Sequence, residues 1–275
     1  AKERAFKAPV INSNGEFQRR LLSRLPFEPT GAQTRVLEEI ASDLNQPVPM
    51  LRLVQGDVGS GKTLVAALAA LAAIDAGYQV ALMAPTELLA EQHLRNFSDW
   101  FAPLGIELTW LSGKVKGKQR SATLDNIASG HARLVVGTHA LFQDAVIFQR
   151  LALVIIDEQH RFGVHQRLAL TQKGEDQGMP HQLVLTATPI PRTLSMLAYA
   201  DLDCSIIDEL PPGRTPVTTS LVDNQRRSNV IERVGNACRE GRQAYWVCTI
   251  IEESEALDAR PAETTAELLR EQLPG

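Results

Sequence analysis

The sequence has few cysteines and no paired ones. Its three cysteines, Cys204, Cys238 and Cys248, lie far apart and form no CxxC pair. Neither a disulfide framework nor a structural zinc site with the usual ligand spacing is therefore expected. Because this cysteine usage fits a reducing compartment, we expect a cytoplasmic protein.

Long apolar runs are also missing. The longest, Leu64 to Ile74, is rich in alanine and ends at Asp75, so it is shorter than the roughly 20 residues that a bilayer-spanning helix needs. It also lacks the flanking residues of a signal peptide. The sequence therefore predicts no membrane segment and no targeting signal.

An overall excess of positive charge is absent as well. The chain has 28 Lys and Arg against 32 Asp and Glu, a net charge of −4, so any binding to nucleic acid must use a local surface. Residues 1–35 contain seven basic and three acidic residues. We interpret them as a connector rather than a DNA contact, because charged runs are usually solvated.

The length and composition are those of an ordinary globular protein. The chain has 275 residues and is 44% hydrophobic, enough for a sizeable core. At about 150 residues per domain, this length predicts one large domain, or one domain and part of another. The first residue is Ala1 rather than Met, and we expect a fragment of a longer polypeptide.

Short apolar runs that are typical of buried strands alternate with longer helical patterns. This alternation predicts a parallel sheet with helices on both faces, a doubly wound α/β domain. The predicted strands are Leu51–Val54, Val80–Met83, Leu108–Leu111, Leu134–Val136, Leu153–Ile156 and Leu183–Leu185, and the predicted helices are Leu64–Ala76, Glu87–Phe101 and Gln119–Ser129.

A cluster of proline and glycine at residues 211–216 indicates a linker, because it disfavours both a helix and a central strand. The alternation then restarts, with predicted strands at Val217–Val222 and Ala244–Ile250 and predicted helices at Arg226–Glu240 and Ala262–Gln272. Since two strands cannot enclose a core, we expect the beginning of a second, incomplete α/β domain.

The strongest motif is GDVGSGKT at residues 56–63, a GxxxxGK[ST] pattern between a predicted strand and a predicted helix. Its glycines allow backbone N–H groups to surround a phosphate, and the helix adds its positive end. We expect Lys62 to pair with the β- and γ-phosphates of ATP and Thr63 to ligate Mg²⁺. The predicted nucleotide contacts are Gly56, Asp57, Val58, Gly59, Ser60, Gly61, Lys62 and Thr63.

Two carboxylates follow the apolar strand Leu153–Ile156, in the sequence DEQH at residues 157–160. Open α/β sheets bind ligands at this end of their strands. Asp157 is expected to hold Mg²⁺ through its water shell, and Glu158 to orient and deprotonate the attacking water. Because adjacent strand residues point to opposite faces, both can act only if the strand ends there. The alternative interpretation of these carboxylates is an acidic turn between a strand and a loop. The presence of a P-loop in the same chain favours the catalytic interpretation.

Together, these motifs resemble superfamily 2 helicases and translocases, in which a DExH box follows a P-loop. Other segments resemble further motifs of this superfamily in order: residues 27–30 with Gln33 (the Q motif), 84–92 (motif Ia), 136–141, 186–188 (motif III) and 245–248 (motif IV). The resemblance implies a RecA-like fold and an adenine site at Phe27 and Gln33, since an amide can donate to and accept from the adenine edge.

Longer strings narrow this resemblance. DEQHRFGV at 157–164 and TATPIPRTL at 186–194 resemble RecG-type DNA helicases and the related transcription-repair coupling factors, and IDELPPGR at 207–214 favours the RecG type. The resemblance covers about residues 25–255. It implies an ATP- and Mg²⁺-dependent motor that remodels branched DNA, such as stalled forks and Holliday junctions, in recombination and repair. A coupling-factor-like DNA translocase and a nucleotide-gated DNA-binding module without productive turnover remain alternatives.

The resemblance also implies a domain organisation. It predicts a connector at 1–24, a RecA-like ATP-binding domain at 25–210, a linker at 211–216 and the start of a second RecA-like domain at 217–275. The family carries a wedge domain before the motor, and motifs V and VI with an arginine finger beyond the position of Gly275. Since that finger contributes strongly to phosphoryl transfer, we expect the isolated chain to bind nucleotide but to hydrolyse it weakly.

The resemblance finally implies how hydrolysis and DNA are linked. His160 is placed beside the attacking water, where it contacts motif III, so His160, Thr186 and Thr188 couple the nucleotide to DNA. The predicted DNA contacts are Pro85, Thr86, Gly113, Lys114 and Thr138, which can hold phosphates without reading bases. The basic run at residues 114–120 is either a solvated loop or part of this track, and its position beside Gly113 favours the track.

Overall fold

The computed structural model describes residues 7–158, 178–188, 202–209, 217–248 and 262–273. The chain divides into two compact units, residues 1–214 and residues 215–275. The first unit contains the sheet, and the second contains helices. None of the described helices is long and apolar enough to cross a membrane.

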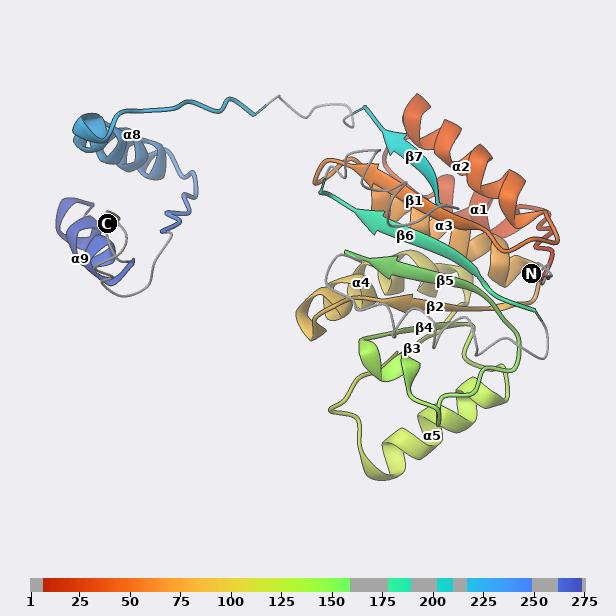
Figure 1. Ribbon diagram of the computed structural model, residues 1–275. Helices are drawn as coiled ribbons and strands as arrows, with labels where there is room; N and C mark the ends of the chain where they lie inside the picture. Colours follow the sequence, from red (N-terminus) through yellow and green to blue (C-terminus); the bar gives the residue numbers. More distant parts are fainter. Residues whose placement is uncertain (1–6, 159–177, 189–201, 210–216, 249–261, 274–275) are drawn as a thin grey trace, which may run out of the picture. The chain divides into compact units, whose positions relative to one another are not determined.

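A parallel sheet forms the centre of the first unit, with seven strands among the described residues (Figure 1). Its strands are β1 (Leu51–Gly56), β2 (Gln79–Met83), β3 (Leu108–Leu111), β4 (Leu134–Gly137), β5 (Leu151–Asp157), β6 (His181–Thr186) and β7 (Asp203–Ile207). Their order across the sheet is β3-β4-β2-β5-β6-β1-β7. All six strands that the sequence predicts in this unit are confirmed, and five of them extend by one or more residues.

Helices cover both faces of the sheet, as the doubly wound fold requires. They are α1 (Glu16–Leu22), α2 (Gly31–Leu44), α3 (Lys62–Asp75), α4 (Glu87–Phe101) and α5 (Gly117–Ala128), with short 3₁₀ turns η1 (Ala102–Leu104) and η2 (His139–Phe142). The core with α1 to α4 contains Leu153 and Ile155 of β5, whereas the core with α5 contains Val154 and Ile156. This alternation places successive β5 side chains in opposite layers.

The sequence pattern did not predict three elements of this unit. Helices α1 and α2 lie before the first predicted strand, and β7 lies at the edge of the sheet beside β1. Residues 7–24, the predicted connector, pack along α3, where Gln18 Nε2 donates to the Leu68 carbonyl at 2.9 Å and the Ser13 hydroxyl donates to Asp75 at 2.7 Å.

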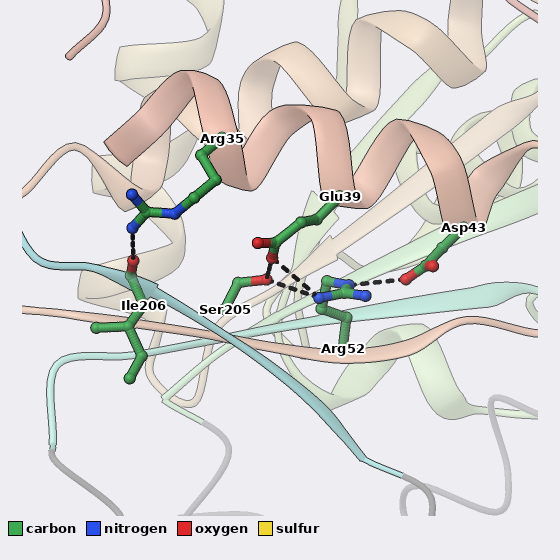
Figure 2. A network of polar contacts seen from close by, with 6 residues as sticks. All are labelled: Arg35, Glu39, Asp43, Arg52, Ser205 and Ile206. Carbon is green, nitrogen blue, oxygen red and sulfur yellow. Dashed lines mark hydrogen bonds and ion pairs between the residues drawn. The ribbon is translucent and has the colours of Figure 1, made fainter. Parts of the chain in front are cut away.

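A buried arginine holds α2 against the two strands at this edge (Figure 2). Arg52 of β1, only 9% exposed, donates to Asp43 at 2.7 Å and to Glu39 at 3.2 Å, both on α2. It also donates to the Ser205 hydroxyl of β7 at 2.8 Å, and that hydroxyl in turn donates to Glu39. The network fixes α2, whose first turn lies beside the P-loop.

In the second unit, both predicted helices are confirmed, as α8 (Arg227–Arg239) and α9 (Ala262–Gln272), with a short 3₁₀ turn η4 (Asn224–Arg226) before α8. The predicted strand Val217–Val222 is wrong, and so is the described part, residues 244–248, of the predicted strand Ala244–Ile250. Val217 is 85% exposed and Val247 89%. A strand-like sequence needs a neighbouring strand to pair with, and the described residues of this unit provide none.

Candidate nucleotide and nucleic-acid site

The P-loop connects the end of β1 to the start of α3. Gly59 and Gly61 have positive φ angles of 82° and 89°, in the left-handed region that favours glycine. A Cβ atom at Gly61 would lie 2.2 Å from the Gln33 side-chain nitrogen. Gly61 caps α3, so that Lys62 and Thr63 are its first two residues. The unpaired N–H groups of this first turn suit a bound phosphate.

The side chain of Lys62 contacts the backbone of its own loop. Its ammonium group donates to the carbonyl of Gly56 at 2.6 Å and to that of Asp57 at 2.9 Å. Burial lowers the pKa of Lys62, whereas the nearby charges of Asp157 and Glu158 act to raise it. The lysine therefore belongs to the same electrostatic cluster as the two carboxylates.

The carboxylates lie at the end of β5, as the sequence argument requires. Asp157 is the last residue of the strand, and Glu158 has a φ angle of 51°, which is unusual for a residue with a side chain. Strand β6 lies between β5 and β1, with Leu185 beside Asp157 and Thr186 beside Gln55. The parallel strands thus bring the carboxylates, Thr186 and the P-loop to one edge of the sheet.

Glu158 contacts motif III directly. Its Oε1 accepts a hydrogen bond from the Ala187 backbone N–H at 3.2 Å, and its Oε2 accepts one from the Thr186 hydroxyl at 3.4 Å. The Thr186 hydroxyl oxygen also accepts from the Thr188 N–H at 3.1 Å. The sequence assigned the contact with motif III to His160, which lies outside the described residues. Sequence reasoning missed the contact of Glu158.

Asp157 has a partner that the sequence did not suggest. His93 Nε2 lies 2.6 Å from Asp157 Oδ2, although the two residues are 64 positions apart. His93 directly follows the segment that resembles motif Ia, which was the only available signal. The remaining carboxylate oxygen of Asp157 and the Thr63 hydroxyl are both hard oxygen ligands, and they fit Mg²⁺.

The predicted adenine residues lie on the other side of the P-loop. Gln33 is 3% exposed, and its amide accepts from the Thr30 N–H at 3.0 Å and donates to the Ser60 carbonyl at 2.8 Å. Only one N–H and one lone pair of this amide are left for a purine. Phe27, 47% exposed, lines a cavity of about 730 Å³ with residues 26–31 and Glu209.

Glu209, like His93, lies near the site and was not predicted from the sequence. Its Oε2 accepts from the Ala32 N–H at 3.0 Å, in the first turn of α2. Beside it, Arg35 of α2 donates to Asp208 at 2.9 Å. The two residues that follow β7 by one and two positions, Asp208 and Glu209, are therefore attached to the helix that carries Gln33.

The predicted DNA contacts gather at the carboxyl ends of β2, β3 and β4. Thr86, after β2, caps α4 by accepting from the Leu89 N–H at 3.3 Å. Lys114, after β3, forms an ion pair with Glu87, and its hydrogen bond is the main reason that the pKa of Glu87 is lowered. Thr138, after β4, is 2% exposed, and its hydroxyl has no hydrogen-bond partner among the described residues.

Gly113 and Pro85 complete this set. A Cβ atom at Gly113 would meet no described atom within 4 Å, so the backbone there is open to a close approach. Pro85 directly precedes the cap of α4. The three loops thus form one edge that is continuous with the carboxylate end of β5, since β2 pairs with both β4 and β5.

This combination of a parallel sheet, a P-loop and a carboxylate pair defines the core of a P-loop nucleotide-binding protein. The sequence profile of the DEAD/DEAH box helicases matches residues 30–197, more than half of the chain. The chain belongs to the DEAD/DEAH box helicase family, and its first unit has the RecA-like α/β fold.

Within this family the chain is similar to RecG. It is 66% identical over 271 residues to the ATP-dependent DNA helicase RecG of Escherichia coli (strain K12), covering 98% of this chain and 39% of the relative. It is 48% identical to the RecG of Aquifex aeolicus (strain VF5), covering 93% of this chain and 32% of that protein. The chain therefore spans between about a third and two fifths of the length of these curated relatives.

A solved structure of RecG bound to a three-way DNA junction is similar throughout this chain. It has a TM-score of 0.82 and 38% identity, and the match covers 98% of this chain and 35% of that one. The helicase MrfA, with a TM-score of 0.66 and 16% identity over 94% of this chain and 40% of that one, shares the fold.

Proposed function

We propose that the chain is the motor part of an ATP-dependent DNA helicase or translocase that remodels branched DNA in recombination and repair. The main support is the sheet edge that gathers the P-loop, Asp157, Glu158 and Thr186 beside the three candidate DNA loops. The similarity to RecG adds the class of substrate, because the solved RecG structure is bound to a three-way DNA junction.

The phosphates of ATP are held by the P-loop in this proposal. Backbone N–H groups of Gly59, Ser60 and Gly61 surround them, and Lys62 turns from the carbonyls of its own loop to the β- and γ-phosphates. Thr63 and Asp157 hold Mg²⁺, which when bound neutralises charge on the phosphates. Phe27 and Gln33 contact the adenine base, Phe27 through its exposed ring face in the cavity.

Glu158 has two tasks in this mechanism. It orients and deprotonates the attacking water, and it reports the state of the nucleotide to motif III through its bonds to Thr186 and Ala187. A carboxylate that receives a proton loses strength as an acceptor, so these bonds weaken during hydrolysis. Thr186 and Thr188 then transmit the change, and we keep His160 as a further member of this link.

The DNA track consists of Pro85, Thr86, Gly113, Lys114 and Thr138. Support comes from the buried Thr138 hydroxyl, which has no partner among the described residues, from the open backbone at Gly113 and from Lys114, whose side chain is 82% exposed. These groups suit phosphates rather than bases, as movement along any sequence requires. Glu87 would repel a phosphate here, and it is paired with Lys114.

Removing the charge of Lys114 and removing that of Glu87 are expected to have opposite effects on DNA binding. Lys114→Gln should weaken binding and reduce the slope of log affinity against log salt by about 0.7 for the lost contact with single-stranded DNA. Glu87→Gln should strengthen binding, because Lys114 then pairs with phosphate alone. Fluorescence anisotropy with labelled DNA at several salt concentrations measures both effects.

Lys7→Gln is the control for this pair, since it removes one exposed charge from the other end of the domain. Its salt slope should equal that of the wild type. A Lys114→Gln variant with an unchanged slope would remove Lys114 from the track.

Stimulation of ATP hydrolysis by DNA tests the function itself. The rate of phosphate release by the intact protein is measured without DNA, with linear duplex and with a three-way junction of the same length and base composition. The proposal predicts the fastest release with the junction, because branched DNA is the substrate. Equal stimulation by both DNAs would favour a translocase like the transcription-repair coupling factors, and no stimulation would favour a nucleotide-gated binding module.

The intact protein is expected to have further partners. A wedge domain and the remainder of the second motor domain would complete the arrangement that the RecG relatives imply, since this chain spans 39% of the Escherichia coli protein. We also place the protein in the cytoplasm, on the cysteine usage of its sequence.

A further inference from the structure

A buried histidine on α4 faces the metal-binding carboxylate. His93 is 7% exposed, and its Nε2 lies 2.6 Å from Asp157 Oδ2. The side chain of Asp157 is itself only 14% exposed. A contact this short and this shielded from water fixes both side chains more strongly than an exposed pair would.

The chemistry of the two groups sets the direction of the hydrogen bond. An ionised carboxylate can only accept, so His93 Nε2 must carry the proton and donate it. The other ring nitrogen, Nδ1, is buried and has no hydrogen-bond partner among the described residues. The tautomer protonated at Nε2 therefore uses the donor where an acceptor exists and leaves only a lone pair at Nδ1.

Packing fixes the orientation of the imidazole ring as well. Phe97, one turn further along α4, meets it edge-to-face, with ring centroids 6.3 Å apart and an angle of 79° between the planes. Phe97 is fully buried in the core beneath α4. This packing therefore restrains rotation of the ring away from Asp157.

We propose that His93 is a positioning residue for the magnesium site. By binding Oδ2 of Asp157 it directs the other carboxylate oxygen toward Mg²⁺ and its water shell. This inference rests on the proposed function, in which Asp157 holds Mg²⁺. Groups that orient a ligating carboxylate typically contribute about tenfold to a hundredfold to metal affinity.

Two substitutions of similar length separate this role from packing. His93→Gln keeps an N–H donor at about the position of Nε2, whereas His93→Met fills a similar volume without a donor. Both residues are good helix formers, so α4 should persist in each variant. A role in packing alone predicts that both variants behave alike, whereas a positioning role predicts that they differ.

The Mg²⁺ requirement of nucleotide binding measures the difference. Binding of a fluorescent ATP analogue is followed while Mg²⁺ is titrated. We expect His93→Met to raise the half-saturating Mg²⁺ concentration roughly tenfold and His93→Gln to stay within about threefold of the wild type. Affinity measured in EDTA should be the same in all three proteins, because the P-loop contacts are unchanged.

His181→Met is the matched control. His181 is also fully buried, but its ring nitrogens contact the Met50 N–H and the Pro9 carbonyl at the opposite end of β6. This variant should lower the thermal midpoint without changing the Mg²⁺ requirement. If His93→Met does not fold, His93→Asn replaces it, because its shorter amide cannot reach Asp157.

The outcomes separate the two proposals. If His93→Met, or His93→Asn in its place, kept the wild-type Mg²⁺ requirement, the role of His93 would be overturned and the proposed function would stand. Nucleotide binding by the wild type that does not respond to Mg²⁺ would overturn the magnesium site itself. A raised requirement in that variant, restored by His93→Gln, supports the positioning role.

Discussion

Replacing Glu158 with glutamine is expected to slow DNA-stimulated ATP hydrolysis by about a hundredfold or more. The amide has the same size and can still accept a hydrogen bond from the Ala187 N–H, which Glu158 accepts at 3.2 Å. It cannot take a proton from the attacking water. The P-loop and Asp157 are unchanged in this variant. Nucleotide affinity should therefore stay within about threefold of the wild type, because a single hydrogen bond at residue 158 contributes little to binding.

Phosphate release and equilibrium nucleotide binding, measured on the same preparations, test this prediction. Glu107→Gln is the control, since Glu107 is an exposed carboxylate just before β3, at the end of the sheet opposite to the site. It should match the wild type in both measurements. If Glu158→Gln lost nucleotide binding instead, the residue would be part of the binding site and not the base.

Replacing Lys62 with alanine is expected to have the largest effect on nucleotide binding. Its ammonium group is the only side-chain cation that the P-loop sequence supplies, and the loss of a charge-assisted contact to phosphate costs about 3 kcal/mol, or roughly a hundredfold in affinity. The fold should tolerate the change, because among the described residues the lysine donates to the carbonyls of its own loop alone, those of Gly56 and Asp57.

Isothermal titration with ATP and Mg²⁺ gives the affinity, and thermal unfolding without nucleotide gives the stability. Lys118→Ala on α5 removes an exposed lysine from another face of the domain and should leave both unchanged. An alanine variant of Lys62 that binds ATP like the wild type would mean that the phosphates lie elsewhere.

The interior of the fold could be predicted because burial leaves a simple pattern. β5 is buried on both faces, and its uninterrupted apolar run predicted a strand. β7 could not be found in this way, because only Ser205 and Ile207 of its five residues are buried, so it lacks a continuous apolar run. Helix α2 did carry a signal, the capping box of Thr30 and Gln33, which the alternation of strands and helices did not use.

The second unit shows the limit of local patterns. The sequence of residues 217–222 and 244–248 is typical of strands, yet the structure forms no strand there. A strand is stable only beside another strand. Helices α8 and α9 were predicted correctly because a helix satisfies its own backbone hydrogen bonds.

The candidate site also has one part that could be predicted from the sequence and one part that could not. The P-loop could be predicted because its chemistry depends on residues within one turn of chain, with glycines at fixed spacing. The contacts of Glu158 with Thr186 and of His93 with Asp157 join residues 28 and 64 positions apart. Only the order of the parallel strands brings these residues together, and no spacing in the sequence encodes that order.

The most direct measurement of the central claim is strand separation of a labelled three-way junction. The intact protein, with its wedge domain and complete second motor domain, should separate the strands with ATP and Mg²⁺, and should fail to do so with a non-hydrolysable analogue or with Glu158→Gln. That result would show that hydrolysis at this site drives movement on branched DNA. Separation at the same rate without hydrolysis would contradict the account, because the protein would then act by binding alone.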